Sequence, residues 1–202
     1  CQCYFTSCLC KDSLAGSANL FMNHTYSDAD LENMITWQNL ASECWKKNWS
    51  QVLLLLRKNQ QTLGFAESCT GGLLSTSLTS LFGVSDVFMG SVVSYANQVK
   101  MDFLSVSENS LKDHGAVSEQ VALEMARGAR AKLKCSWALA ITGIAGPSGG
   151  SVDKPVGTVC FAVCGPNFEA SVKQKFSGDR AAIQVHSVRF VIGMLGKALL
   201  GL

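Results

Sequence analysis

The stretch TLGFAESCTGGLLSTSL places hydroxyl and thiol side chains beside two glycines. Ser68, Cys69 and Thr70 follow a short apolar run and precede a helical pattern, so we expect them at a strand-to-helix joint. The unpaired N–H groups and partial positive charge of a helix N-terminus stabilise an oxyanion. Gly71 and Gly72 leave room for a substrate to approach the backbone. The segment predicts either a nucleophile with its oxyanion site or an ordinary capped turn.

A serine nucleophile needs a group that takes its proton. The three histidines are poor candidates, because His24 lies near the N-terminus, His114 precedes a turn glycine and His186 falls inside a helical pattern. A lysine can act as the base when burial or neighbouring positive charge lowers its pKa. SYANQVK supplies Tyr95 at the end of an apolar strand and Lys100 on a short helical turn. Taken alone, the pair is equally consistent with exposed side chains near a strand end.

A third segment, WALAITGIAGPSGGSVDKPVGTV, is suited to holding an anion. Its apolar strand pattern ends at Thr142 and continues into a loop with four glycines between Gly143 and Gly150. Backbone N–H groups in such a loop can bind phosphate or ribose, and Lys154 adds charge nearby; the alternative is a flexible surface loop. In FSGDR, Arg180 falls in the first turn of a helix, where a cation is unfavourable unless an anion lies close.

Short apolar runs that alternate with helical patterns after Gly64 predict a layered α/β domain to position these residues. We expect strands near 63–67, 87–95, 137–142, 156–163 and 170–176. We expect helices at 71–82, 118–134 and 179–200. The last helix is apolar nearly all round, so it is either buried or in contact with another subunit, as in a homodimer.

The N-terminal part of the sequence lacks the alternation of apolar runs and helical patterns seen after Gly64. Residues 1–26 show no periodicity and are expected to be irregular, and the following 27–61 contain neither Pro nor Gly, which predicts one helix or two. Two Cys-x-Cys pairs lie at the start and are interpreted as free thiols, with a metal site as the alternative: Cys1, Cys3, Cys8 and Cys10. Because position 1 is Cys, we expect a fragment or a processed form.

Bulk properties exclude several classes of partner. The formal net charge is +2, which gives no general electrostatic reason for binding nucleic acid or a membrane surface. The apolar stretches at 52–56 and 188–202 are judged too short for a membrane span, and the second carries Arg189 and Lys197. The nine cysteines do not form a disulfide pattern, which predicts the cytoplasm or another reduced intracellular compartment.

Six segments in this order, AESCTGG, SYANQVK, HGAVSE, ITGIAGPSGG, KPVGTV and FSGDR, closely resemble the nicotinamide-nucleotide amidohydrolase family, also called the CinA C-terminal domain family. The resemblance covers roughly residues 38–200. It implies a three-layer α/β/α sandwich with a mixed central sheet. It also implies hydrolysis of the carboxamide of nicotinamide mononucleotide to nicotinic acid mononucleotide and ammonia, without a metal or cofactor. A small-molecule nucleotide is then the expected partner.

Carried over position by position, the resemblance places the nucleophile at Ser68, the base at Lys100, supporting hydroxyls at Tyr95 and Thr142, and an anion-binding side chain at Arg180. The other positions that we expect to contact substrate are Cys69, Thr70, Gly71, Gly72, Gly143, Gly146, Gly149 and Lys154. One position departs from the family pattern, since Ser148 replaces the Gly or Asp of many relatives.

The resemblance divides the chain into a cysteine-containing leader at 1–37, which includes the start of a helix, and an amidohydrolase domain at 38–202. Two-domain relatives carry a larger domain upstream, and 37 residues are too few to form it. Two alternatives stay open. Cys69 rather than Ser68 could be the nucleophile, or the chain could be a non-catalytic nucleotide- or protein-binding module of the competence-associated type.

Overall fold

A computed structural model of the chain describes residue 45 and residues 47–201. The expected irregular leader, the four N-terminal cysteines and the boundary at residue 37 lie outside this part. Of the helical region expected over 27–61, the structure describes a helix at residue 45 and over residues 47–58.

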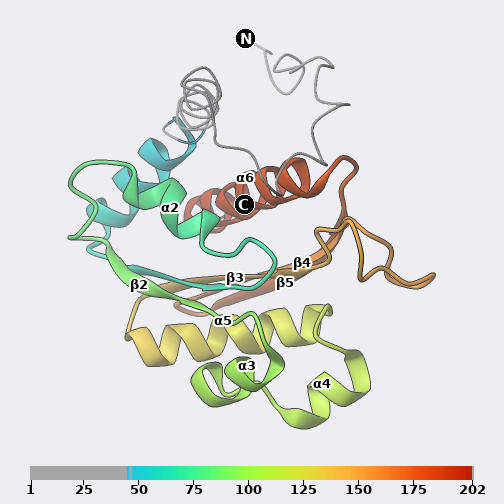
Figure 1. Ribbon diagram of the computed structural model, residues 1–202. Helices are drawn as coiled ribbons and strands as arrows, with labels where there is room; N and C mark the ends of the chain where they lie inside the picture. Colours follow the sequence, from blue (N-terminus) through green and yellow to red (C-terminus); the bar gives the residue numbers. More distant parts are fainter. Residues whose placement is uncertain (1–44, 46, 202) are drawn as a thin grey trace, which may run out of the picture. The chain divides into compact units, whose positions relative to one another are not determined.

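A mixed five-stranded sheet with the order β2-β1-β3-β4-β5 forms the centre of the domain (Figure 1). In its parallel part, β1 (Leu63–Glu67) lies between β2 (Phe88–Val93) and β3 (Trp137–Gly143). In its antiparallel part, β4 (Thr158–Gly165) pairs with β3 and with β5 (Phe168–Lys175). The predicted mixed sheet is confirmed, and each strand end differs from the expectation by at most two residues.

Helices cover both faces of the sheet, which confirms the three-layer sandwich (Figure 1). One face packs against α2 (Leu73–Thr79), α6 (Arg180–Leu200) and the helix at 47–58, and large side chains fill this layer. The other face packs against α5 (Glu119–Leu133), and small side chains let that helix approach closely. Because side chains alternate along a strand, β1, β3 and β4 contribute to both layers.

Two short helices lie between β2 and β3: α3 (Asn97–Leu104), where only a short helical turn at Lys100 was expected, and α4 (Glu108–His114), which was not predicted. Each has at most eight residues, too few to show a helical period clearly. The backbone of α3 lies against α5 at Gly128, where an added Cβ would sit 1.9 Å from the carbonyl oxygen of Leu104. This contact fixes the place of α3, which carries Lys100.

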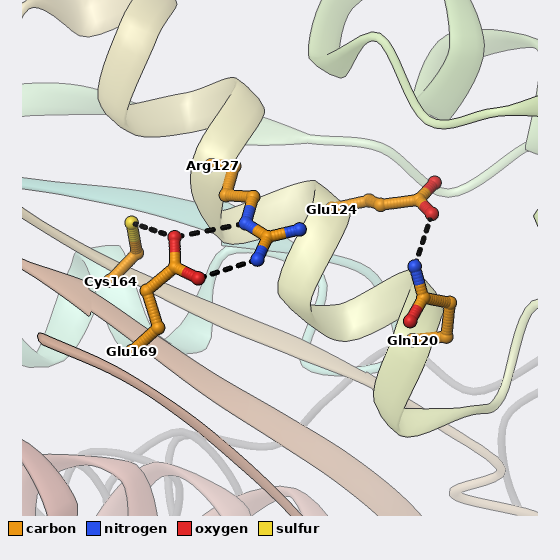
Figure 2. A network of polar contacts seen from close by, with 5 residues as sticks. All are labelled: Gln120, Glu124, Arg127, Cys164 and Glu169. Atoms are coloured by element: carbon orange, nitrogen blue, oxygen red, sulfur yellow. Dashed lines mark hydrogen bonds and ion pairs between the residues drawn. The ribbon is translucent and has the colours of Figure 1, made fainter.

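Polar contacts join the outer surface of α5 to the antiparallel part of the sheet (Figure 2). Arg127 forms an ion pair with Glu169 on β5, with Nε 2.9 Å from Oε1. The same carboxylate oxygen lies 3.5 Å from the Cys164 thiol. Nearer the start of the same helix, Gln120 donates to Glu124. Such exposed pairs contribute up to about 1 kcal/mol each, so they supplement rather than determine the packing.

The last helix, expected over 179–200, is confirmed at Arg180–Leu200. Its 21 residues would by length and hydropathy alone be able to cross a membrane. The judgement that this region is too short for a membrane span considered only residues 188–202 and was wrong. A third of its apolar window is buried, and it packs against α2, β3 and β4 through Ile183, Val188, Val191, Ile192 and Leu195. Packing inside the α/β domain accounts for the apolar character of this face.

Candidate active site

The residues singled out by the sequence gather where strand order reverses. β1 lies between β2 and β3, so successive connections leave toward opposite sides, and crevices at the carboxyl ends of such strands commonly bind ligands. A cavity of about 250 Å³ lies there. Nine of the thirteen predicted site residues line it: Ser68, Cys69, Tyr95, Lys100, Thr142, Gly143, Gly146, Gly149 and Arg180.

Lys100 and Ser68 lie within proton-transfer distance. The Nζ of Lys100 is 3.1 Å from the Oγ of Ser68 and donates to the carbonyl of Ser94 at 2.6 Å. The lysine is 1% exposed and the serine 8%. Burial lowers the pKa of Lys100 because a dry environment disfavours the charged amine. A neutral amine beside a hydroxyl can accept its proton, which is the chemistry that an activated serine needs.

A residue that was not singled out from the sequence organises the turn that carries Ser68. Glu67, the last residue of β1, is fully buried, and its carboxylate accepts five hydrogen bonds. The donors are the hydroxyls of Thr70 and Ser75 and the N–H groups of Gly72, Leu74 and Ser75. One signal could have revealed it: a carboxylate ends a strand whose other residues are all apolar or glycine, LGFAE.

These contacts correct the expected oxyanion site. The helix begins at Leu73 rather than residue 71, the N–H of Gly72 donates to Glu67, and that of Gly71 donates to the carbonyl of Ser68. Gly71 and Gly72 have φ values of 60° and 102°, so the turn needs glycine for its backbone conformation. Neither glycine lines the cavity. By contrast, the N–H groups of Cys69 and Thr70 donate to none of the backbone or carboxylate oxygens that bind the glycines of this turn.

Cys69 is poorly suited to be the nucleophile. Its side chain is 5% exposed, and burial raises the pKa of the thiol to about 12, although Arg180 and Lys100 oppose this shift. A protonated thiol is a weak nucleophile at neutral pH. The main-chain carbonyl of Cys69 accepts a 2.7 Å bond from Gln184 of α6, which joins the turn that carries Ser68 to the last helix.

Tyr95 and Arg180 form one wall of the cavity. The Tyr95 hydroxyl accepts from Nη2 of Arg180 at 3.2 Å, and Nη1 donates to the carbonyl of Gly146 at 3.0 Å. Tyr95 approaches Lys100 only through its main-chain oxygen, at 3.5 Å, and its side chain is 62% exposed. The Tyr95 hydroxyl therefore lies beside Arg180 rather than beside the Lys100 amine.

The glycine-rich loop and the HGAVSE segment also line the cavity. Thr142 Oγ1 donates to the carbonyl of Ala116 at 2.8 Å. Lys154 does not line the cavity, because its Nζ donates to the carbonyl of His114 at 2.6 Å and so fastens the loop to the end of α4. The side chain of Thr70, bonded to Glu67, is also outside the cavity. Lining residues that the predicted set lacked are Asn97, Ala116, Val117, Ile144, Ala145 and Ser148.

No group of three or more His, Cys, Asp or Glu side chains suited to a metal ion occurs within the described residues. The arrangement is a serine beside a buried lysine whose pKa is lowered by burial, at a cavity that Arg180 also lines.

Comparisons with known proteins identify relatives of this domain. Residues 46–199 match the family model of the CinA C-terminal domain. A CinA-like protein of Fervidobacterium nodosum is 48% identical over 149 residues, which are 74% of this chain and 36% of that protein. Another, from Prochlorococcus marinus subsp. pastoris, is 52% identical over 140 residues, 68% of this chain and 32% of that protein. The chain thus spans about a third of the length of these curated relatives.

Solved structures of similar proteins support the same family assignment. A competence-damaged protein (CinA) superfamily protein from Klebsiella pneumoniae superposes with a TM-score of 0.75 at 32% identity, covering 78% of this chain and 99% of that one. The competence/damage-inducible protein CihA from Agrobacterium tumefaciens gives 0.74 at 37% identity, covering 77% and 95%.

Proposed function

The chain belongs to the CinA C-terminal domain family, and we propose that it hydrolyses the carboxamide of nicotinamide mononucleotide to nicotinic acid mononucleotide and ammonia, with Ser68 as nucleophile and Lys100 as base. The observation that carries the proposal is the 3.1 Å separation between Lys100 Nζ and Ser68 Oγ in a buried setting. Burial disfavours the charged form of the amine, and a neutral lysine has a lone pair that can accept the proton of the adjacent hydroxyl.

In the first half-reaction, Nζ of Lys100 takes the proton of Ser68, and Oγ attacks the carboxamide carbon. The oxygen of the tetrahedral intermediate accepts from the N–H groups of Cys69 and Thr70. Removing one such donor typically costs about 3 kcal/mol of transition-state stabilisation. The C–N bond then breaks, and Lys100 returns its proton to the departing nitrogen, which leaves as ammonia.

In the second half-reaction, water attacks the ester between Ser68 and the pyridine carbonyl. Lys100 takes a proton from the water and returns it to Oγ of Ser68 as the ester bond breaks. The product is the free carboxylate, and the enzyme is regenerated.

We propose that the substrate phosphate binds at Arg180 and the glycine-rich loop. Arg180 reaches into the cavity from the first turn of α6 and contacts only neutral oxygens among the described residues, those of Tyr95 and Gly146. A guanidinium with no carboxylate partner is suited to a phosphate group. Lys154 is not part of this proposal, because its amine is held by the carbonyl of His114.

The test is ammonia release from nicotinamide mononucleotide by the full chain, with Ser68→Ala, Lys100→Met and Cys69→Ala variants. We expect the first two to lose nearly all turnover and the third to keep most of it. Calorimetry with the same nucleotide completes the test. Binding without product in the unaltered chain would reject the hydrolase in favour of a binding module, and turnover surviving in Ser68→Ala would remove the serine from the reaction.

A further inference from the structure

We propose that Glu67 is a positioning residue that aligns the nucleophile with its base: its carboxylate fixes the Ser68 turn, and its main-chain carbonyl fixes the segment that holds the Lys100 amine. The inference rests on the proposed function for the roles of Ser68 and Lys100. Glu67 itself does not line the cavity, so it acts through these neighbours.

The side-chain contacts hold the turn from both ends. Oε2 accepts from the Thr70 hydroxyl at 2.8 Å and from the N–H groups of Gly72 and Leu74 at 3.0 Å. Oε1 accepts from the N–H of Ser75 at 2.9 Å and from its hydroxyl. Ser68 therefore lies between the residue that accepts these bonds and the residues that donate them. The turn cannot move relative to β1 without breaking several charge-assisted hydrogen bonds.

The main-chain contacts extend the arrangement to the base. The carbonyl oxygen of Glu67 accepts from the N–H of Ser94 at 2.7 Å and from its hydroxyl at 3.3 Å. The carbonyl of Ser94 accepts from Lys100 Nζ at 2.6 Å. Glu67 thus links the two segments that supply the nucleophile and the base, and every group in the link is buried.

A purely structural cap is the competing explanation, since Glu67 covers the start of α2. A cap needs one or two acceptors, which Ser, Thr, Asp or Asn next to the helix supplies without a deeply buried charge. Here a buried carboxylate binds five donors across a turn whose helix has only seven residues. Burying a charge is unfavourable unless it is fully hydrogen-bonded, so its use for so short a helix indicates that the turn geometry itself matters. The Thr70 hydroxyl then serves this geometry rather than contacting substrate, while its N–H remains a proposed oxyanion donor.

The experiment measures the second-order rate constant for labelling Ser68 in the full chain by a small fluorophosphonate, as a function of pH. We expect the rate to rise as Lys100 loses its proton and to reach a plateau. Glu67→Gln should lower the plateau about 100-fold through misalignment. Thr70→Val and Ser75→Ala, which each remove one hydroxyl from the carboxylate, should lower it roughly three- to tenfold. Thr79→Val, an exposed hydroxyl on the same helix, is the matched control and should leave it unchanged.

The midpoint of the labelling rate against pH distinguishes two effects of the substitutions: misalignment of Ser68 and Lys100, and a general loosening of the structure around Lys100. Misalignment lowers the plateau at an unchanged midpoint, whereas water entering around Lys100 would raise the midpoint by relieving burial. The rate constant, unlike the labelled amount, does not depend on how much protein is folded. If Glu67→Gln does not fold, Thr70→Val and Ser75→Ala still test whether the contacts of the Glu67 carboxylate align Ser68 with Lys100.

Unchanged plateaus in all three variants, or a raised midpoint with an unchanged plateau, would overturn the inference. An unaltered chain that is not labelled at all would overturn it together with the serine mechanism. A chain that is labelled in the expected pattern but releases no ammonia from nicotinamide mononucleotide would reject the proposed substrate and leave the role of Glu67 supported.

Discussion

Replacing Lys100 with methionine should change stability in a way that depends on pH. Burial places the pKa of Lys100 below its ordinary value of 10.5, and the unfolded chain should titrate at about that ordinary value. Between the two pKa values the unfolded state therefore binds more protons than the folded state. Stability of the unaltered chain then rises with pH by up to about 1.4 kcal/mol per pH unit within that window. Methionine has a similar length and no proton to lose, so the variant lacks this contribution.

A second effect of Lys100→Met does not vary with pH. The carbonyl of Ser94 loses the donor that lies 2.6 Å away, and a buried unpaired carbonyl costs about 1–3 kcal/mol. Above the ordinary lysine pKa the variant should therefore be the less stable protein by this amount. Toward neutral pH the difference should shrink or reverse, because the unaltered chain there carries the cost of keeping a buried amine unprotonated.

Urea unfolding at several values between about pH 7 and about pH 10.5 measures the difference between the two proteins. Lys132→Met, at an exposed lysine of α5, is the matched control for replacing a lysine by methionine. A difference between Lys100→Met and the unaltered chain that does not vary with pH would refute the reasoning, because it would mean that Lys100 keeps its proton to the same extent in both states.

Three further outcomes follow from the site. Cys69→Ala should keep most of the turnover, and the Cys69 thiol should react slowly with alkylating reagents near pH 7, because burial raises its pKa to about 12; rapid alkylation of the folded chain would contradict this. Arg180→Gln should raise KM for nicotinamide mononucleotide at least tenfold, about 1.4 kcal/mol, but change that for the phosphate-free riboside little; equal effects on both would argue against a phosphate contact. Lys154→Met should cost up to about 1 kcal/mol in urea unfolding through loss of its bond to His114, with KM nearly unchanged; a large rise in KM would return Lys154 to the substrate site.

The sequence predicted the strands well because their apolar runs are long and are bounded by glycine or polar residues. It also predicted that Ser68, Lys100, Thr142 and Arg180 converge, since family segments constrain their spacing. The patterns of α3 and α4 were too short to resolve. Such short segments take their structure from packing, as the contact of α3 with Gly128 illustrates.

The errors within the site have a common cause: the sequence shows which polar groups exist, but not which of them already have partners. The N–H of Gly72 donates to Glu67 and the amine of Lys154 donates to His114, so neither group is available to a substrate. The Tyr95 hydroxyl likewise lies with Arg180 rather than with Lys100. Glu67 was missed because its five donors come from residues three to eight positions later, which matches no short capping pattern.

The central claim is that an uncharged Lys100 activates Ser68, and trapping the covalent intermediate tests it most directly. The full chain is mixed with nicotinamide mononucleotide, quenched in acid within the first turnovers and digested, and the modified residue is located by mass spectrometry. The account predicts an acyl group on Ser68 in the unaltered chain and in Cys69→Ala, and none in Lys100→Met. An acyl group on Cys69, or equal acylation of Ser68 without Lys100, would contradict it.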